Sequence, residues 1–406
     1  MTDATIPRSE HPRPQFVRDD WMNLNGQWQF EIDVADSGIH RGLCERELAS
    51  EITVPFAPET PLSGVEHGDY INAAWYRREV EIPADWTGRR VLLHFQAVNT
   101  DATVWVNGQE VYRHRGGWSP FTADLSGVAS PGERALVVVR ARHNRRKMGA
   151  YGKGFMGFTP GAFDGSCMAM TGIWQTVWLE PVAEVHFHRP RITPDVAGQR
   201  FRLELPISQN RAGHRVRATL AWAGETLTAA EVRADGDFSP MLDLDIPDEC
   251  LHLWGPGQGN LYDIALELLD ADGRVVDAAV TYAGLRSVTI DGRAVKINGD
   301  RVFQRLVLDQ GQYLDGAYTA PSDAALIEDM ELSLAAGFNG ARLHEKVFEE
   351  RSLYHADRLG YLVWGEFGDW GYNSANPPMD MVTQWLEVIG RDFNHPSIVG
   401  WCGLNE

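Results

Sequence analysis

The chain has 406 residues, 44% of them hydrophobic and 23% charged, which is typical of a globular protein with room for about two to four domains. Its 56 acidic and 37 basic residues give a formal net charge of -19, which argues against nucleic acid or an anionic membrane as partner and favours neutral ligands. Its four cysteines are widely scattered, so neither a zinc site nor a disulfide framework is indicated.

The N-terminal region has no signal-peptide pattern, and no apolar run is long enough to span a membrane. We therefore expect a cytoplasmic protein. Residues 1 to about 20 are polar and include His11-Pro12-Arg13-Pro14, which indicates an extended arm.

Short alternating runs separated by turn signals fill the chain from Trp21 onward and predict an antiparallel β-sandwich. Asn107-Gly108 lies at the tip of one predicted hairpin. The segment Gly149 to Met170 is too long for an ordinary connection, and either a ligand-facing loop or a floppy insert would explain it. The predicted strands are 24–32, 75–83, 90–95, 103–111, 135–141 and 174–179.

The chain is rich in tryptophan, with 14 residues of this type. Large sandwich cores would explain them, and so would stacking against sugar rings, because an indole offers both an apolar body and a polar handle. Both explanations remain open at this point.

A second β-rich block runs from about Val185 to Leu285, and its size and pattern fit an immunoglobulin-like sandwich. Because it contains no constellation of chemical groups, we expect a spacer. The strands predicted in this block are 200–207, 215–222, 238–246 and 262–269, with a turn at 270–273 before 275–276.

From about Arg286 the pattern changes, and after a hairpin over 288–297 strands begin to alternate with helices. Such units require a parallel sheet, as half of a (β/α)8 barrel or as part of a doubly wound sheet. No Gly-x-Gly-x-x-Gly follows the first strand, which disfavours a dinucleotide-binding domain. The predicted strands are 302–309, 338–344, 361–367 and 398–406. Three helices are predicted between them: the first is capped by Ser322, the second covers 348–359 and ends at Gly360, and the third covers 381–393.

The last predicted strand follows the turn Asn394-His395-Pro396-Ser397, because Pro396 fixes its own φ and keeps His395 out of helical geometry. Ile398 to Leu404 is apolar, as in a strand buried on both faces, and ends in Asn405-Glu406. A carboxyl is costly to bury there, so it is either paired or chemically used.

Polar residues stand at the carboxyl ends of all four predicted strands, where parallel barrels assemble their active sites. Each has a structural alternative: Asp309 could cap the turn at Gln310-Gly311. Arg342 and Glu366 could form an ion pair across neighbouring strands. His344 could be an ordinary loop residue. Their convergence nevertheless suggests a mouth for a neutral, polyhydroxylated ligand, and paired carboxylates are the usual groups of glycoside hydrolysis. The candidates are Asp309, Arg342, His344, Glu366, Asn405 and Glu406.

From about residue 20 to its last residue the chain resembles glycoside hydrolase family 2, the family of β-galactosidases, β-glucuronidases and β-mannosidases. Stretches similar to its sugar-binding jelly-roll domain are Trp75-Tyr76-Arg77-Arg78, Val104 to Gly108, Gly116 to Phe121 and Gly172 to Glu180. Stretches similar to its two barrel signatures are Gly337 to Arg342 and Asn394 to Glu406.

The resemblance implies that Glu406 is the general acid/base and that Asn405 holds the substrate's 2-hydroxyl. Arg342 would orient the carboxylates, and Glu366 would line the pocket at a position that helps bind magnesium in some bacterial β-galactosidases. Family members commonly have a histidine three residues after the arginine, whereas His344 stands two after it. We keep His344 and Asp309 as substrate-binding candidates because they lie at predicted strand ends, and we expect no cofactor.

The resemblance also implies three domains: an arm and jelly roll (1–183), an immunoglobulin-like sandwich (184–285), and the first four strands of a TIM barrel (286–406). The implied activity is retaining hydrolysis of β-glycosides, with β-galactosidase favoured over β-glucuronidase or β-mannosidase. The alternative is a non-catalytic carbohydrate-binding protein that uses the jelly roll. The partner is then a glycoside or oligosaccharide, with neither nucleic acid nor membrane, and a homo-oligomer stays open.

The family's nucleophile is a second glutamate on a later strand, to which no residue here corresponds. We therefore expect the chain to be a C-terminally incomplete fragment that hydrolyses no glycoside by itself. We also expect its barrel part to aggregate or stay partly unfolded, because an isolated half barrel leaves a sheet edge and an apolar face uncovered.

Overall fold

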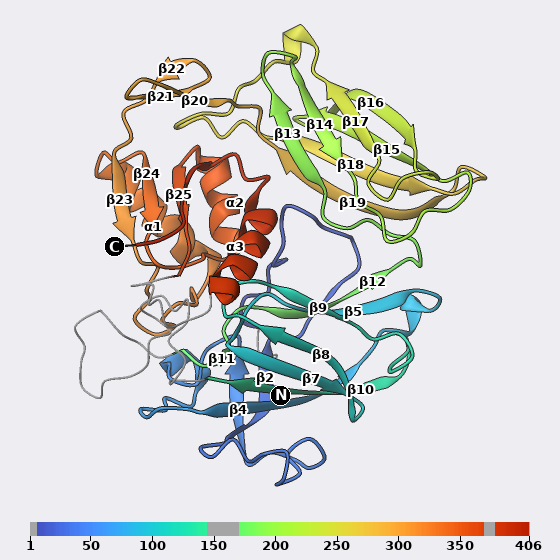
Figure 1. Cartoon of the computed structure of the whole chain (residues 1–406), viewed down its shortest axis with the longest axis vertical. Helices are drawn as coiled ribbons and strands as arrows, with labels where there is room; N and C mark the ends of the chain where they lie inside the picture. The colour runs from blue at the N-terminus through green and yellow to red at the C-terminus, as the bar shows by residue number, and fades with distance from the viewer. Residues whose placement is uncertain (1–5, 144–169, 369–377, 406) are drawn as a thin grey trace.

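The computed structural model describes residues 6–143, 170–368 and 378–405. Two β-sandwich regions lie at opposite ends of the molecule, and a smaller region of parallel strands and helices lies beside both of them (Figure 1). Among the described residues, no helix has the length and apolar character needed to cross a membrane.

The first sandwich packs a six-stranded sheet, in the order β3-β2-β4-β10-β7-β8, against a four-stranded sheet, in the order β1-β12-β5-β9. A short pair, β6 and β11, accompanies them. The strands are β1 (Met22–Asn23), β2 (Gly26–Ile32), β3 (Ser50–Val54), β4 (Ala73–Glu81), β5 (Arg90–Phe95), β6 (Val98–Asn99), β7 (Asp101–Val106), β8 (Gln109–Arg115), β9 (Phe121–Asp124), β10 (Arg134–Arg142), β11 (Gly172–Ile173) and β12 (Val177–Val182).

The predicted hairpin around Asn107-Gly108 is confirmed: Val106 pairs with Gln109, and both tip residues have positive φ (50° and 79°). Seven of the 14 tryptophans are buried in the described residues, as the core explanation requires: Trp28, Trp75, Trp86, Trp118, Trp174, Trp178 and Trp254. Of the predicted long loop Gly149 to Met170, all but Met170 lies outside the described residues.

The second sandwich packs the sheet β13-β14-β17 against the sheet β16-β15-β18-β19. Two of these strands, β13 and β16, were not predicted. β13 contains Pro194, which argues against a strand, and β16 is an edge strand with few buried side chains. The strands are β13 (Arg191–Asp195), β14 (Arg200–Glu204), β15 (Arg215–Trp222), β16 (Glu225–Arg233), β17 (Met241–Asp245), β18 (Tyr262–Leu269) and β19 (Val275–Ala283).

After a small antiparallel sheet of β20 (Val288–Asp291), β21 (Ala294–Ile297) and β22 (Asp300–Arg301), strands and helices alternate as predicted. The four strands pair in parallel and in sequence order, β23-β24-β25-β26. They are β23 (Leu306–Asp309), β24 (Gly340–Leu343), β25 (Leu362–Glu366) and β26 (Ile398–Cys402), and the helices between them are α1 (Asp323–Ala335), α2 (Glu350–Leu359) and α3 (Pro378–Asp392).

The local signals at the helix ends are confirmed. The Ser322 hydroxyl accepts a hydrogen bond from the Ala325 N–H and so caps α1, and Gly360 ends α2 in the left-handed conformation at φ 63°. The prediction that β26 is buried on both faces is wrong, because Trp401 is 38% exposed. Among the described residues, the Trp401 ring lies against Gly365 of β25 and Trp385 of α3, which cover only part of it.

The N-terminal arm joins these regions through buried charges. Arg18 pairs with Glu180 of the first sandwich (3.1 Å) and with Asp277 of the second (2.9 Å), and Arg13 also donates to Glu180 (2.9 Å). Farther along, Arg8 donates to Glu349, just before α2 (2.6 Å). The arm therefore fixes both sandwiches and the parallel-sheet region to one another.

A second buried carboxylate is Glu350 in the first turn of α2. It accepts hydrogen bonds from Nη1 (2.8 Å) and Nη2 (2.9 Å) of Arg189. Gln96 of the first sandwich donates to it as well (3.2 Å). Burial opposes the charged form, but Arg189 and then Arg391 outweigh it and lower the pKa of Glu350 to about 2.

This lowered pKa predicts acid sensitivity. A carboxylate whose folded-state pKa lies below its ordinary value of 4.5 contributes stability that is present at higher pH and is lost as the pH falls toward 2. From about pH 6 to about pH 3 the loss from Glu350 alone should be about 2 kcal/mol. Urea unfolding across this range should show Glu350→Gln to be less stable than wild type at pH 6 and less sensitive to acid.

The matched control is Glu110→Gln, because Glu110 pairs with Arg113 on the surface. This control should keep the full acid sensitivity of the wild type. Equal slopes for wild type and Glu350→Gln would contradict the role assigned to Glu350.

Candidate functional site

Three of the predicted site residues meet at the carboxyl end of the parallel sheet. Arg342 on β24 donates two hydrogen bonds to Glu366 at the end of β25, from Nε (2.6 Å) and from Nη2 (3.1 Å). The same Nη2 donates to the Asn405 side-chain oxygen, three residues beyond β26 (2.7 Å). Neighbouring parallel strands end at the same edge of a sheet, so residues far apart in sequence come together here.

The electrostatics of this group are those of a paired carboxylate. The Glu366 side chain is fully buried, while that of Arg342 is 32% exposed and reaches outward. Burial by itself would lower the pKa of Arg342, but the hydrogen bond and the charge of Glu366 outweigh burial and raise this pKa. The ion-pair interpretation of Arg342 and Glu366 is therefore confirmed, and the pair also holds Asn405.

Glu345 belongs to the same group but was not predicted. Its backbone N–H donates to Glu366 (2.9 Å), and its side-chain Oε1 accepts a hydrogen bond from the Asn405 amide. The residue is completely buried and has a positive φ of 53°, which is unusual for a side chain other than glycine. Its position directly after His344 at a strand end is the one signal in the sequence that points to it.

The other two strand-end candidates lie next to this group. The Asp309 carboxylate accepts a hydrogen bond from the Gly311 N–H (2.7 Å), which confirms its turn-capping role. His344 is buried, and its backbone N–H donates to the Asp309 carbonyl oxygen (2.7 Å). Its Nε2 lies 3.6 Å from Glu345 Oε1. These contacts join the loops after β23 and β24.

Lys346 strengthens the same connection, and the sequence analysis did not single it out. Its buried ammonium donates to the carbonyl oxygens of Gly311 (2.6 Å) and Tyr318 (2.8 Å). Burial lowers the pKa of Lys346 to about 8. Since both of its bonds go to backbone oxygens of the loop after β23, its role is to hold that loop.

The first sandwich forms a wall beside the end of β25. Trp118, from the Gly116 to Phe121 stretch, is fully buried and packs with Trp174, Tyr318 and Phe367. A side chain on Gly368 would collide with the Trp118 ring, so the chain after Glu366 runs directly along this indole. The Trp118 motif thus positions the strand end, and its indole is covered.

Glu406, the predicted acid/base, lies outside the described residues. No group of three or more His, Cys, Asp and Glu side chains that could hold a metal ion is found within residues 6–143, 170–368 and 378–405. The magnesium role that the resemblance implies for Glu366 stays a prediction. In this structure both oxygens of Glu366 accept hydrogen bonds, from the Arg342 guanidinium and the Glu345 N–H.

Known proteins are similar to this chain in sequence and in fold. A β-glucuronidase of Paenibacillus borealis is 27% identical over 411 residues, which cover 95% of this chain and 67% of that protein. A β-galactosidase of Thermoanaerobacter pseudethanolicus is 24% identical, with 94% of this chain and 50% of that protein covered. The solved β-glucuronidase from Ruminococcus gnavus in complex with D-glucaro-d-lactam has the same fold (TM-score 0.82, 23% identity, 99% of this chain and 69% of that chain covered).

The chain therefore spans two thirds of the length of the first of these relatives and half of the second. Two models of one family also match it. "Glycosyl hydrolases family 2, sugar binding domain" matches residues 21–179, and "Glycosyl hydrolases family 2" matches residues 185–286. Together the two models account for well over half of the sequence, and the chain belongs to glycosyl hydrolases family 2.

Proposed function

We propose that the protein hydrolyses β-glycosides with retention of configuration, in a double displacement. The observation that carries this proposal is the meeting of Arg342, Glu366 and Asn405 at the ends of three neighbouring parallel strands. Parallel β/α folds gather their reacting groups at that edge, and family membership gives the chemistry that such groups serve.

In this mechanism Glu406 protonates the leaving oxygen and then, as base, activates the water that hydrolyses the glycosyl-enzyme. Asn405, next to it in the chain, holds the substrate's 2-hydroxyl. Arg342 and Glu345 fix the Asn405 amide from both of its ends, because its oxygen accepts from Arg342 and its nitrogen donates to Glu345. Glu366 acts through Arg342, which it neutralises and orients. The nucleophile is a second carboxylate, which we assign to no residue of this chain.

The proposal includes a (β/α)8 barrel of which residues 286–406 supply the first four strands, after a jelly roll (to residue 183) and an immunoglobulin-like sandwich (184–285). The strand order β23-β24-β25-β26 follows the sequence, as in such a barrel, whereas a doubly wound sheet reverses its order at one point. Separate buried clusters in the two sandwiches and the parallel sheet support the division.

We place β-glucuronides first among the substrates, ahead of the β-galactosides that the sequence alone favours. The support is the activity named for the Paenibacillus borealis relative and the fold shared with the Ruminococcus gnavus enzyme. β-Galactosides come second, because the Thermoanaerobacter pseudethanolicus relative is a β-galactosidase. A uronic acid is anionic, so its carboxylate needs a local cation in a chain with a net charge of -19.

The test is a panel of nitrophenyl β-D-glucuronide, β-D-galactoside and β-D-mannoside with a purified protein that carries both this chain and the nucleophile, because we expect the 406 residues by themselves to hydrolyse none of the three. We expect the highest kcat/KM for the glucuronide, with no change on addition of EDTA. A highest kcat/KM for another β-glycoside would overturn the choice of sugar alone. Sugar binding without turnover would favour a non-catalytic carbohydrate-binding protein, which the match of residues 21–179 to a sugar-binding domain also suggests.

Arg342→Lys tests the site itself. A lysine keeps the charge but cannot hold Glu366 through two nitrogens and Asn405 at the same time. We expect kcat to fall about 100-fold, because a displacement of about 1 Å costs this much. The free energy of unfolding should fall by about 1 kcal/mol, since Arg342 is partly exposed.

Arg217→Lys is the matched control, because Arg217 donates to Glu267 on the outer face of the second sandwich. This variant should keep full activity. If Arg342→Lys also keeps wild-type kcat, the site does not lie at this edge of the sheet.

A further inference from the structure

We infer that Tyr282, Asp357, His395 and Arg286 form a clamp by which the second sandwich and α2 set the position of β26, and that these are positioning residues for Asn405. The inference rests on the proposed function, because it explains how the site is held in place. It also replaces the expectation that the second sandwich is a spacer.

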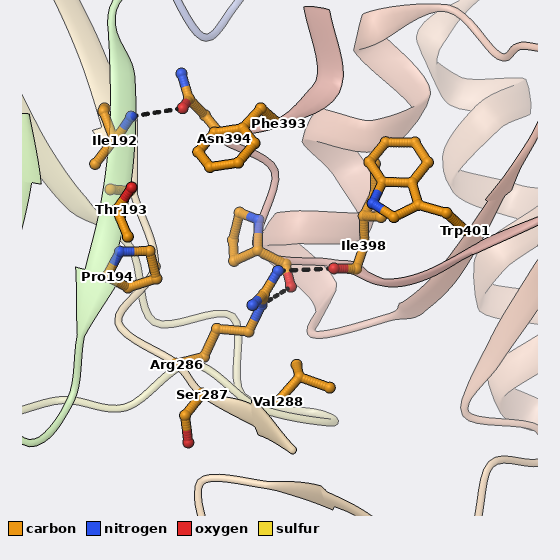
Figure 2. A pocket seen from close by; sticks show the side chains of 13 residues that line it. Ile192, Thr193, Pro194, Arg286, Ser287, Val288, Phe393, Asn394, Ile398 and Trp401 are labelled. Carbon is orange, nitrogen blue, oxygen red and sulfur yellow. Dashed lines mark hydrogen bonds between the residues drawn. The ribbon is translucent and has the colours of Figure 1, made fainter. Parts of the chain in front are cut away.

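The clamp begins at Asn394, the first residue of the Asn-His-Pro-Ser turn. Its side-chain oxygen accepts a hydrogen bond from the Ile192 N–H, and its amide nitrogen donates to the Pro190 carbonyl oxygen, both at 2.8 Å. Figure 2 shows the Asn394 side chain directed toward Ile192 on β13. The side chain thus satisfies backbone groups at the start of the second sandwich and docks the turn there.

His395 enters a fully buried cluster around Asp357 of α2. Its Nδ1 lies 2.6 Å from Asp357 Oδ2, and Tyr282 at the end of β19 donates its hydroxyl to the same oxygen (2.7 Å). The other carboxylate oxygen accepts the Ser397 N–H (3.0 Å). One buried carboxylate therefore joins α2, the second sandwich and both ends of the His395 to Ser397 segment.

Arg286, just after the second sandwich, holds the backbone where the turn becomes the strand. Its guanidinium donates to the carbonyl oxygens of Pro396 (2.6 Å) and Ile398 (2.7 Å), as Figure 2 shows. Burial lowers the pKa of Arg286 to about 10, so the group keeps its charge at neutral pH. Both bonds are charge-assisted and fix two points of the strand entry.

Close packing completes the clamp. A Cβ on Gly284 would lie 2.8 Å from Pro396 Cβ and 3.0 Å from Trp254 Cβ, so the absence of a side chain there lets the turn approach the end of β19.

A cavity of about 410 Å³ opens beside the turn, between Thr193, Ser287 and Trp401 (Figure 2).

The clamp matters for the site because β26 leads directly to Asn405. The pairing of β26 with β25 contains a register irregularity between Val363 and Trp364. Asn405 follows Ile398 by seven residues, a distance of about 20 Å in extended chain. A slip of one residue would turn every side chain of the strand to the opposite face. The clamp fixes the start of β26, and Arg342 and Glu345 fix Asn405 beyond its other end.

Tyr282→Phe tests the inference, because it removes the hydroxyl that donates to Asp357 and keeps the ring. The matched control is Tyr262→Phe, a buried tyrosine of the same sandwich whose hydroxyl donates to the Cys250 carbonyl oxygen (2.6 Å). Both variants should lower Tm by a similar amount. Tyr282→Phe should lower kcat about tenfold with little change in KM, because it misplaces a transition-state contact, whereas Tyr262→Phe should keep kcat within about twofold.

Hydrogen exchange gives a readout that does not need activity. Amides of residues 398–405 should exchange faster in Tyr282→Phe than in wild type and be unchanged in Tyr262→Phe. Arg286→Lys, which cannot reach both carbonyl oxygens with the same geometry, should shift exchange and kcat in the same direction as Tyr282→Phe.

The inference is overturned if Tyr282→Phe and Arg286→Lys leave the exchange of 398–405 as it is in Tyr262→Phe, or if all three variants lose kcat only in proportion to Tm. A wild-type protein that carries the nucleophile as well as this chain and hydrolyses no β-glycoside would overturn the proposed function instead. The exchange measurement would still decide whether the clamp sets the position of β26.

Discussion

The position of β26 is the constraint on which the candidate site depends. Arg342 stands on β24 and Glu366 at the end of β25, whereas Asn405 lies three residues beyond β26. The register of β26 decides which way its side chains face and where Asn405 lies. Both ends of β26 are tied to groups outside the strand itself: the start to Asp357 and Arg286, the finish to Arg342 and Glu345.

Buried charges also join the two sandwiches and the parallel-sheet region to one another. Asp357 serves the turn before β26, Glu350 receives Arg189, and Glu180 receives the arm through Arg13 and Arg18. Buried ion pairs add little net stability, because desolvation consumes the gain, but removing one partner leaves the other charge uncompensated. Such pairs specify one arrangement of the three regions, which is what a site built from separate loops requires.

The sequence predicted features whose cause is local. The Asn107-Gly108 hairpin, the Ser322 cap and the Gly360 helix end each depend on a few neighbouring residues, and all three are confirmed. The strand–helix alternation and the pairing of Arg342 with Glu366 were also predictable, although the pairing is not local, because the alternation predicts parallel strands, which bring their ends together.

Features with a distant cause that leaves no pattern in the sequence were not predictable. The left-handed conformation of Glu345 is imposed by contacts with Glu366 and Asn405, which lie 21 and 60 residues away. The exposure of Trp401 depends on which side chains cover its ring, and the apolar pattern of 398–404 carries no sign of it. The partners of the arm are likewise invisible in a polar, proline-rich segment.

The stretch from Asn394 to Glu406 accordingly has two parts with different physical roles. In the first part the sequence predicts a turn, and the polar side chains of Asn394 and His395 are buried there against groups of the second sandwich and α2. In the second part, Asn405 is buried, its side-chain oxygen accepts a hydrogen bond from Arg342, and its side-chain nitrogen donates one to Glu345. The strand between the two parts fixes how many residues separate the anchor, Asn394, from the anchored residue, Asn405. An insertion between them would leave both parts intact and still remove Asn405 from the site.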